Sequence, residues 1–270
     1  MSVDAALAAT LRRERVIALA AMLVIAALAF GWTLHLAAQM AGMDTPAMTG
    51  VTMSHMQMLS PAMTPWSLPL GLYLFAMWAV MMIGMMTPSA APLVLLYLGV
   101  ARHAAGSGHR FVGAAWLLAG YLLAWCLFAL VATLAQWALE STAMMTSSMR
   151  AASPTLGAVV LIAAGIYQWL PVKNACLKQC RAPLAFIQQR GGFKASAAAS
   201  LRLGFEHGLF CVGCCWLLML LLFVFGVMNL LWIAALTLFV LAEKLLPDAP
   251  WLVRAAGAAA IATGLWMVLR

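Results

Sequence analysis

Residues 68–100 read LPLGLYLFAMWAVMMIGMMTPSAAPLVLLYLGV, and this stretch contains no Asp, Glu, Lys or Arg. As one helix it would be about 50 Å long at 1.5 Å per residue, whereas the hydrocarbon core of a bilayer is about 30 Å thick. We therefore predict a transmembrane helix that tilts, kinks at Pro88, or breaks into a span and a short re-entrant piece.

The composition of the whole chain agrees with a membrane protein. Of its 270 residues, 66% are hydrophobic and 8% are charged, whereas soluble domains contain about 45–50% apolar and about 25% charged residues. This excludes a soluble enzyme, a disordered protein and a disulfide-stapled secreted domain. The chain also contains 20 Met and 6 Cys, so many of its apolar positions carry soft sulfur atoms.

We predict an all-α, polytopic transmembrane bundle that forms a single domain over residues 1–270. The expected spans are seven apolar segments, at 16–37, 68–100, 111–138, 155–170, 205–226, 230–246 and 251–269. The short turn from Gly226 to Asn229 predicts an antiparallel hairpin between the fifth and sixth spans. We interpret the first span as a retained anchor, although Leu36-Ala37-Ala38 would also fit a signal-peptide cleavage site.

The basic residues predict the orientation. With a cytoplasmic N-terminus, 13 of the 15 Lys and Arg residues lie on the cytoplasmic side, and only Arg150 and Arg270 lie outside. This follows the positive-inside rule, so we expect a multi-pass protein of a bacterial inner membrane. We attribute the net charge of +8 to topology rather than to nucleic-acid binding. The largest external loop is then 40–66, and the largest cytoplasmic loop is 171–204.

The external loop is rich in methionine. Its segment 53–58 supplies four candidate metal ligands: Met53, His55, Met56 and Met58. Thioether sulfur selects Cu(I) over hard cations, and it persists in an oxidising compartment where exposed thiols would form disulfides. The alternative is a flexible amphipathic loop that lies at the bilayer surface and uses Met as a pliable apolar residue.

The second span carries a methionine ladder. Met77, Met81 and Met85 recur every four residues, and Met82 and Met86 form an adjacent pair. A row of weak thioether sites would let an ion pass from one site to the next. The alternative is a methionine-rich packing face.

The fifth span carries a stripe of soft ligands. Four side chains recur every four residues: His207, Cys211, Cys215 and Met219. A further thiol, Cys214, lies beside them. Gly204, Gly208 and Gly213 would let a neighbouring helix approach this stripe. In the alternative, the cysteines are small core residues and His207 caps or anchors the helix end.

Two further cysteines lie in the cytoplasmic loop. Cys176 and Cys180 would share one face of a helix, and Lys173, Lys178 and Arg181 would favour the metal-binding thiolate. The alternative use is redox exchange with a partner thiol. Glu243-Lys244, at the end of the sixth span, would be either a snorkelling pair or a support for the inner mouth.

Residues 78–92, WAVMMIGMMTPSAAP, resemble the signature of a bacterial family of predicted metal-binding integral membrane proteins, classed as a domain of unknown function. Residues 173–183, residues 208–216 and Glu243-Lys244 resemble that family as well. The resemblance implies about seven helices and a role in metal binding. The M-x-x-x-M spacing is also similar to that of three-span copper transporters, as an analogy only.

We therefore expect a protein that transports or delivers Cu(I) across or within the membrane. The ladder Met77, Met81 and Met85 would face the stripe of the fifth span, and Cys176 and Cys180 would exchange metal at the cytoplasmic mouth. The expected partners are lipid, a copper chaperone or a membrane oxidase, and a second copy of the chain. No nucleotide-binding motif is present, and we assign no catalytic residue. The alternative is a membrane oxidoreductase or an oxidase-assembly subunit with a buried metal or haem.

Overall fold

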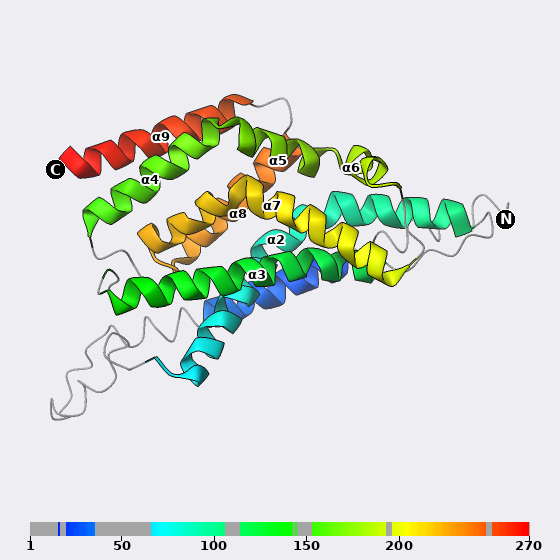
Figure 1. Cartoon of the computed structure of the whole chain (residues 1–270), viewed down its shortest axis with the longest axis horizontal. Helices are drawn as coiled ribbons and strands as arrows, with labels where there is room; N and C mark the ends of the chain where they lie inside the picture. The colour runs from blue at the N-terminus through cyan, green and yellow to red at the C-terminus, as the bar shows by residue number, and fades with distance from the viewer. Residues whose placement is uncertain are drawn as a thin grey trace.

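The computed structural model describes residues 16, 20–35, 66–105, 114–142, 144, 153–192, 196–246 and 250–269. Every regular element in these ranges is a helix, which confirms the all-α prediction for this part of the chain (Figure 1). In chain order the helices are Ala20–His35, α2 (Leu68–Ala105), α3 (Ala114–Ser141), α4 (Pro154–Trp169), α5 (Pro171–Arg181), α6 (Pro183–Gln189), α7 (Ala197–Phe225), α8 (Leu230–Leu245) and α9 (Pro250–Leu269).

Four of these helices, α2, α3, α7 and α9, are long and apolar enough to cross a membrane. The pair α4 and α5 would make a fifth span if it is counted as one bent element, and the helix Ala20–His35 is apolar but shorter. Large apolar side chains such as Leu123, Leu127 and Leu134 of α3 are exposed on the outside of the bundle, as contact with lipid requires. These features fit a polytopic membrane protein, while the count of seven spans and the cytoplasmic N-terminus stay predictions.

The long helix α2 continues through Pro88 and Pro92 without a break, and Figure 1 shows that its two halves run in different directions. A proline lacks the N–H of its turn, and its ring crowds the carbonyl four residues earlier. The Thr87 hydroxyl donates to the carbonyl of Ile83 at 2.6 Å and supports the backbone of this turn. Of the three outcomes predicted for this segment, the structure therefore shows an unbroken, bent helix.

Glycines bring α7 against α3. A Cβ added at Gly204 would overlap the carbonyl of Leu117, and one added at Gly120 would overlap the carbonyl of Leu201. A Cβ at Gly208 would lie 2.9 Å from the carbonyl oxygen of Tyr121. The prediction that Gly204 and Gly208 admit a neighbouring helix is confirmed, and that helix is α3.

A second glycine contact joins α4 to α9, which run side by side at the top of Figure 1. A Cβ added at Gly165 would lie 2.6 Å from the Gly257 carbonyl oxygen, and one added at Gly264 would lie 2.9 Å from that of Ala158. After Trp169 the chain bends by 64° into α5. This bend directs α5 across α7, where the candidate site lies.

The segment 171–204, expected to be a loop, is largely helical. It contains α5, α6 and the first turns of α7. In α5, Lys173, Leu177 and Cys180 are buried. Since these three residues recur at helical spacing, the cysteine pair belongs to an amphipathic helix that packs on the bundle.

The predicted hairpin between the fifth and sixth spans is confirmed. Gly226 ends α7 with a φ of 101°, a left-handed value that favours glycine. The Asn229 N–H donates to the Gly226 carbonyl at 3.1 Å, and the rings of Phe225 and Trp232 stack with centroids 3.8 Å apart. The helix α8 therefore folds back along α7 and brings Glu243 and Lys244 into the bundle.

Candidate functional site

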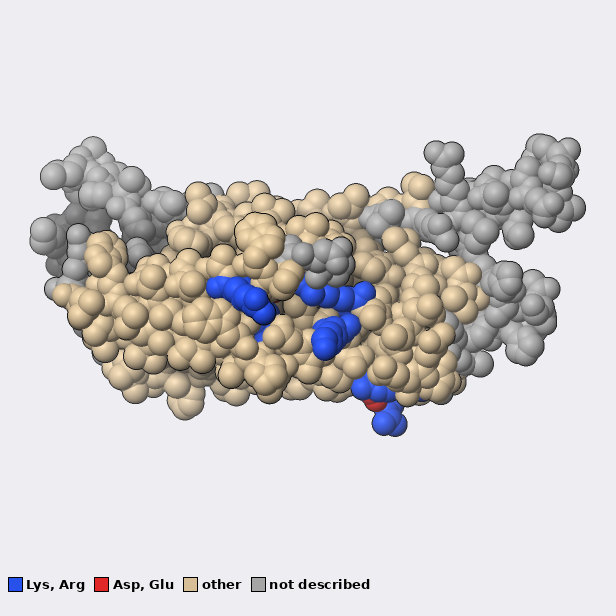
Figure 2. Space-filling view, turned by 90° about the horizontal axis from the view of Figure 1, so that it is seen from above, with Lys and Arg blue, Asp and Glu red and all other residues tan. Residues whose placement is uncertain are grey.

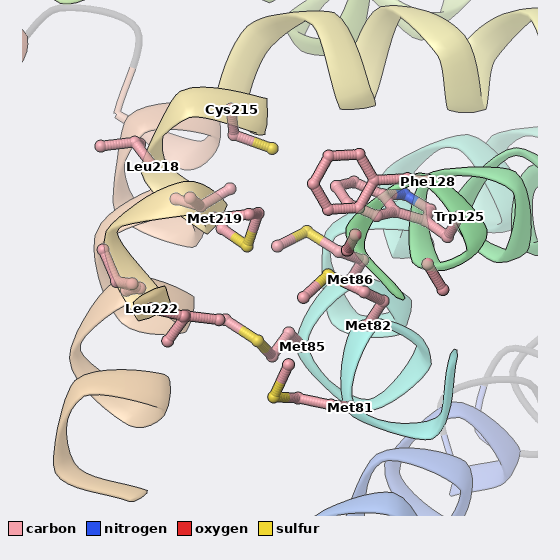
Figure 3. Close-up of a cluster of buried hydrophobic side chains, with 14 of the residues drawn as sticks. Met81, Met82, Met85, Met86, Trp125, Phe128, Cys215, Leu218, Met219 and Leu222 are labelled. Carbon is pink, nitrogen blue, oxygen red and sulfur yellow. The ribbon is translucent and has the colours of Figure 1, made fainter. Parts of the chain in front are cut away.

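The methionine ladder of α2 lies in the core of the bundle. Its five members are at most 3% exposed: Met77, Met81, Met82, Met85 and Met86. Figure 3 shows Met82 and Met86 pointing toward α7, where Met219 and Cys215 point back toward α2. In the same view Met85 points toward Leu222. The pair next to the predicted ladder therefore meets the sulfur atoms of α7.

The stripe of α7 is buried as a whole. His207 is 3% exposed, and Cys211, Cys214, Cys215 and Met219 are at most 1% exposed. All six cysteines of the chain are free thiols. The thiols of Cys214 and Cys215 each donate to the Cys211 carbonyl at 3.0 Å. The cysteines are therefore held by the backbone of their own helix, with their sulfur atoms inside the protein.

The helix α5 brings its two cysteines to this stripe. Cys180 is buried, and its side chain lies close to those of Cys211 and Cys214. Cys176 lies against Gly213, where an added Cβ would be 3.0 Å from its sulfur. The pair of α5 and the three cysteines of α7, which are far apart in the sequence, thus form one cluster, which we call the thiol cluster: Cys176, Cys180, Cys211, Cys214 and Cys215.

Lys244 of α8 contacts the sulfur at the centre of the thiol cluster. Its Nζ lies 2.8 Å from Cys211 Sγ and 2.9 Å from Ser89 Oγ. The Tyr121 hydroxyl is 3.0 Å from the same sulfur. A cation beside a cysteine favours the thiolate, the form that binds metals. Sequence reasoning missed this role for Lys244, although a lysine at the end of an apolar helix is by default a functional candidate.

Two of the three cations that the sequence assigned to the cysteines have other partners. Lys173 donates to both carboxylate oxygens of Glu243 at 2.7 and 2.9 Å, and also to Gln168. Arg181 donates to the Glu243 carbonyl at 2.6 and 2.9 Å. Lys173 and Glu243 are at most 1% exposed, so Glu243-Lys244 is not a snorkelling pair. The buried ion pair instead holds the end of α8 against α5.

His207 lies one turn before Cys211. Its ring packs against Phe186 and Tyr121, with centroid distances of 5.0 and 6.1 Å. Its Nδ1 atom is buried and has no hydrogen-bond partner. Since buried polar atoms are nearly always paired, this nitrogen is available to a ligand.

In the described ranges, no group of three or more His, Cys, Asp or Glu side chains is arranged to hold a metal ion. A soft-metal site in this part of the protein therefore has to combine thiols with methionine thioethers, or form when Lys244 leaves Cys211.

The external candidates Met53, His55, Met56 and Met58 lie outside the described residues. Met144, in the loop that we expect to be the second external one, is 48% exposed. His35, at the end of the first helix, has its ring centroid 6.4 Å from that of Trp32. The structure thus brings the candidate ligands of α2, α5 and α7 together, and the role of the loop at 40–66 stays a prediction.

Comparison with known proteins gives one match. The family model PpoB2, described as copper chaperone, matches residues 75–267. The matched range contains both the thiol cluster and the methionine ladder. No curated protein and no solved structure matches the chain.

Proposed function

The chain belongs to the PpoB2 family of copper chaperones, and on that premise we propose that it binds Cu(I) between α2, α5 and α7 and delivers it within a bacterial inner membrane. The observation that carries this proposal is the meeting of buried methionines of α2 with the thiol cluster of α5 and α7. Thiolate and thioether sulfur are the donors that select Cu(I).

In this proposal copper is the ion that the protein carries. The positive charge of Lys244 at the thiol cluster suits replacement by a monovalent ion. Lys244 places one positive charge beside Cys211. A Cu(I) ion carries the same charge, so it can replace the ammonium at the sulfur without changing the net charge of the buried cluster. Lysine has a long, flexible side chain, and it can withdraw while the site fills.

The arrangement of donors supports a transfer in steps. Met82 and Met86 of α2 face Met219 and Cys215 of α7. On α5, the Cys176 sulfur lies against Gly213 of α7. We propose that thioethers receive the ion, that the thiol cluster holds it, and that Cys176 and Cys180 pass it on. An ion moves more readily along several weak binding sites, one after another, than out of one tight site.

Delivery suits the family better than a free flux of ions, since a chaperone hands its metal to a partner. We propose an acceptor with sulfur ligands, either a soluble copper chaperone or a membrane oxidase under assembly. The external loop would collect copper on the opposite side of the membrane. No step in this scheme requires a nucleotide.

Metal analysis tests the proposal. Full-length protein purified in detergent under reducing conditions is titrated with Cu(I) in the presence of a chromogenic chelator. We expect binding by the wild type and its loss in the triple variant Cys211→Ser, Cys214→Ser, Cys215→Ser. The matched control is Cys126→Ser, since this half-buried thiol of α3 lies outside the thiol cluster.

Two results would overturn the proposal. If the wild type and the triple variant both fail to compete with the chelator, the chain does not bind Cu(I) at this place. A Soret band in the absorbance spectrum of the purified protein would favour the oxidoreductase alternative. Equal elution volumes on size exclusion verify that the triple variant is folded.

A further inference from the structure

The short helix α6 lies over one end of the stripe of α7. It follows α5 directly, and Figure 1 shows it beyond the end of that helix. Its buried side chains, Phe186 and Ile187, are fully enclosed. The Phe186 ring packs edge-on against His207, with a centroid distance of 5.0 Å, and against Phe210 at 5.9 Å. The helix α6 therefore covers the first member of the stripe.

His207 lies next to the copper site proposed above. The ring of Tyr121 is 6.1 Å from that of His207, and the Tyr121 hydroxyl lies 3.0 Å from the Cys211 sulfur. The imidazole is 3% exposed, and its Nδ1 atom has no hydrogen-bond partner. Buried polar atoms are nearly always paired, and imidazole is a suitable ligand for copper. An unused metal ligand thus lies next to both the thiol cluster and α6.

Arg190, directly after α6, holds this helix in place. Its guanidinium carbon lies 4.6 Å from the centre of the Phe186 ring and 5.3 Å from that of Phe210. Its Nη1 atom forms an ion pair with Glu206 of α7 at 2.8 Å. One side chain thus binds both the covering ring and the helix beneath it, through a cation–π contact and an ion pair.

The ion pair is accessible from outside the bundle. The side chains of Arg190 and Glu206 are 32% and 26% exposed, and a cavity of about 310 Å³ borders both. Arg202, which is 81% exposed, contacts the same carboxylate at 2.9 Å. On the described part of the face in Figure 2, acidic atoms appear at one place only and lie between basic side chains. An exposed pair contributes little to stability, so it can break while the protein stays folded.

The chain departs from helical geometry on both sides of α6. Ala182, with a φ of −118° and a ψ of 66°, separates α5 from Pro183, the first residue of α6. After α6, Gly191 and Gly192 have φ values of 81° and 78°, which favour glycine. The helix α6 is therefore tied to the bundle by its own side-chain contacts and not by a continuous helix.

We propose that α6 is a movable cover over His207, and that the ion pair of Arg190 with Glu206 keeps it closed. When the pair breaks, Phe186 moves off His207, and the imidazole takes the Cu(I) ion from Cys211 toward an acceptor at this end of the bundle. The identity of the ion rests on the proposed function above, whereas the burial of His207 can be measured without metal.

Chemical labelling of His207 tests the cover in the metal-free, full-length protein. Diethyl pyrocarbonate acylates accessible imidazole nitrogens, and mass spectrometry of the peptides gives the rate at each histidine. The test variants are Arg190→Gln and Glu206→Gln. The matched control is Arg202→Gln, which makes the same change in the other arginine that pairs with Glu206. The exposed His35 serves as the internal standard.

We expect His207 to be labelled about tenfold faster in Arg190→Gln than in the wild type, because an ion pair and a cation–π contact are both lost. Glu206→Gln should give an intermediate rate, since its cation–π contact remains. Arg190→Lys keeps a cation at both contacts and should stay close to the wild type. Arg202→Gln should be labelled like the wild type.

The rates of copper exchange connect the cover with the copper site. Stopped-flow mixing with Cu(I) measures uptake, and mixing of the loaded protein with a chromogenic chelator measures release. Opening a cover speeds both steps by the same factor and leaves the equilibrium affinity unchanged, and we expect this result for Arg190→Gln. Weaker affinity without faster exchange would overturn the proposal, because Arg190 would then only support the fold.

The cover is also overturned if His207 is labelled at the wild-type rate in both Arg190→Gln and Glu206→Gln. Equal acceleration in Arg202→Gln and Arg190→Gln would overturn it too, because the effect would then be one of total charge. A wild type that binds no Cu(I) would overturn the proposed function, and the labelling rates would still decide whether α6 covers His207. Equal elution volumes on size exclusion verify that the variants are folded.

Discussion

The Lys244 ammonium lies 2.8 Å from the sulfur of Cys211, and this contact joins the end of α8 to the centre of the thiol cluster. Ser89 of α2 and Tyr121 of α3 complete the surroundings of the two groups. The half-buried ammonium thus contacts side chains of α2 and α7, and Tyr121 of α3 contacts the same sulfur. We interpret Lys244 as the counter-charge that keeps Cys211 ready for a metal.

The change Lys244→Met tests this interpretation. Without the ammonium, Cys211 keeps its proton in apolar surroundings, and a metal must displace that proton because the thiolate is the ligand. We expect the variant to release about one more proton per Cu(I) than the wild type. Its affinity for Cu(I) should therefore fall more steeply as the pH is lowered.

Calorimetry in two buffers of different ionisation enthalpy measures the released protons. The control is Lys178→Met, which removes an exposed lysine from α5. If Lys244→Met and Lys178→Met release the same number of protons as the wild type, Lys244 does not hold Cys211 as a thiolate.

The ion pair of Lys173 and Glu243 should be essential for stability. Glu243→Gln leaves the buried Lys173 ammonium without its counter-charge, and breaking such a pair costs about 3–5 kcal/mol. We expect a large drop in the unfolding temperature in detergent. The double variant Lys173→Met, Glu243→Leu removes both charges and should recover most of the loss. A double variant as unstable as Glu243→Gln would contradict this account.

Most helix boundaries could be predicted, because long apolar runs bounded by turn residues decide them. The expected spans 230–246 and 251–269 differ by one residue from α8 and α9. The expected start at 205 is wrong for α7, which begins at Ala197. The Ser196 hydroxyl caps this helix by accepting from the Ala199 N–H at 3.2 Å. The first two turns contain Ser200 and Arg202, and apolar periodicity alone does not detect them.

The ligand types of the candidate site could be predicted, and their partners could not. Residues 173–181 contain three basic residues and two cysteines, so local sequence favoured cations next to thiols. In the structure the helical rotation of about 100° per residue directs Glu243 toward Lys173 and Lys244 toward Cys211. Which helix each residue meets depends on the bend after Trp169. Pro171 favours a break there because the residue before a proline is pushed into an extended conformation, but the direction of α5 depends on tertiary packing.

The close contact of α3 and α7 gives a prediction about packing. Gly204→Ala places a methyl group on the Leu117 carbonyl, and backbone cannot move aside as a side chain can. We expect a loss of roughly 1–3 kcal/mol, as for other overpacked cores. The control is Gly31→Ala, where nothing lies within 4 Å of the added Cβ. Thermal unfolding of both variants in detergent measures the loss of stability. Equal stability would show that α3 and α7 can move apart without a loss of folding free energy.

The methionines of α2 differ in what they face, and this difference can be tested without disturbing the core. Met82 and Met86 point toward Met219 and Cys215, whereas Met77 belongs to the ladder predicted from the sequence. A change of Met to Leu nearly conserves volume and usually costs less than about 1.5 kcal/mol, so each variant should fold. The double variant Met82→Leu, Met86→Leu removes two soft donors next to the thiol cluster.

We expect this double variant to bind Cu(I) at least about tenfold more weakly, a loss of about 1.4 kcal/mol in binding free energy. We expect Met77→Leu to bind like the wild type, since Met77 lies more than one helical turn from Met82 and Met86. Competition with a chromogenic chelator measures both affinities. The opposite ranking would make the ladder of Met77, Met81 and Met85 the copper-binding face. Wild-type affinity in both variants would show that the methionines of α2 fill space and that the thiols alone hold the ion.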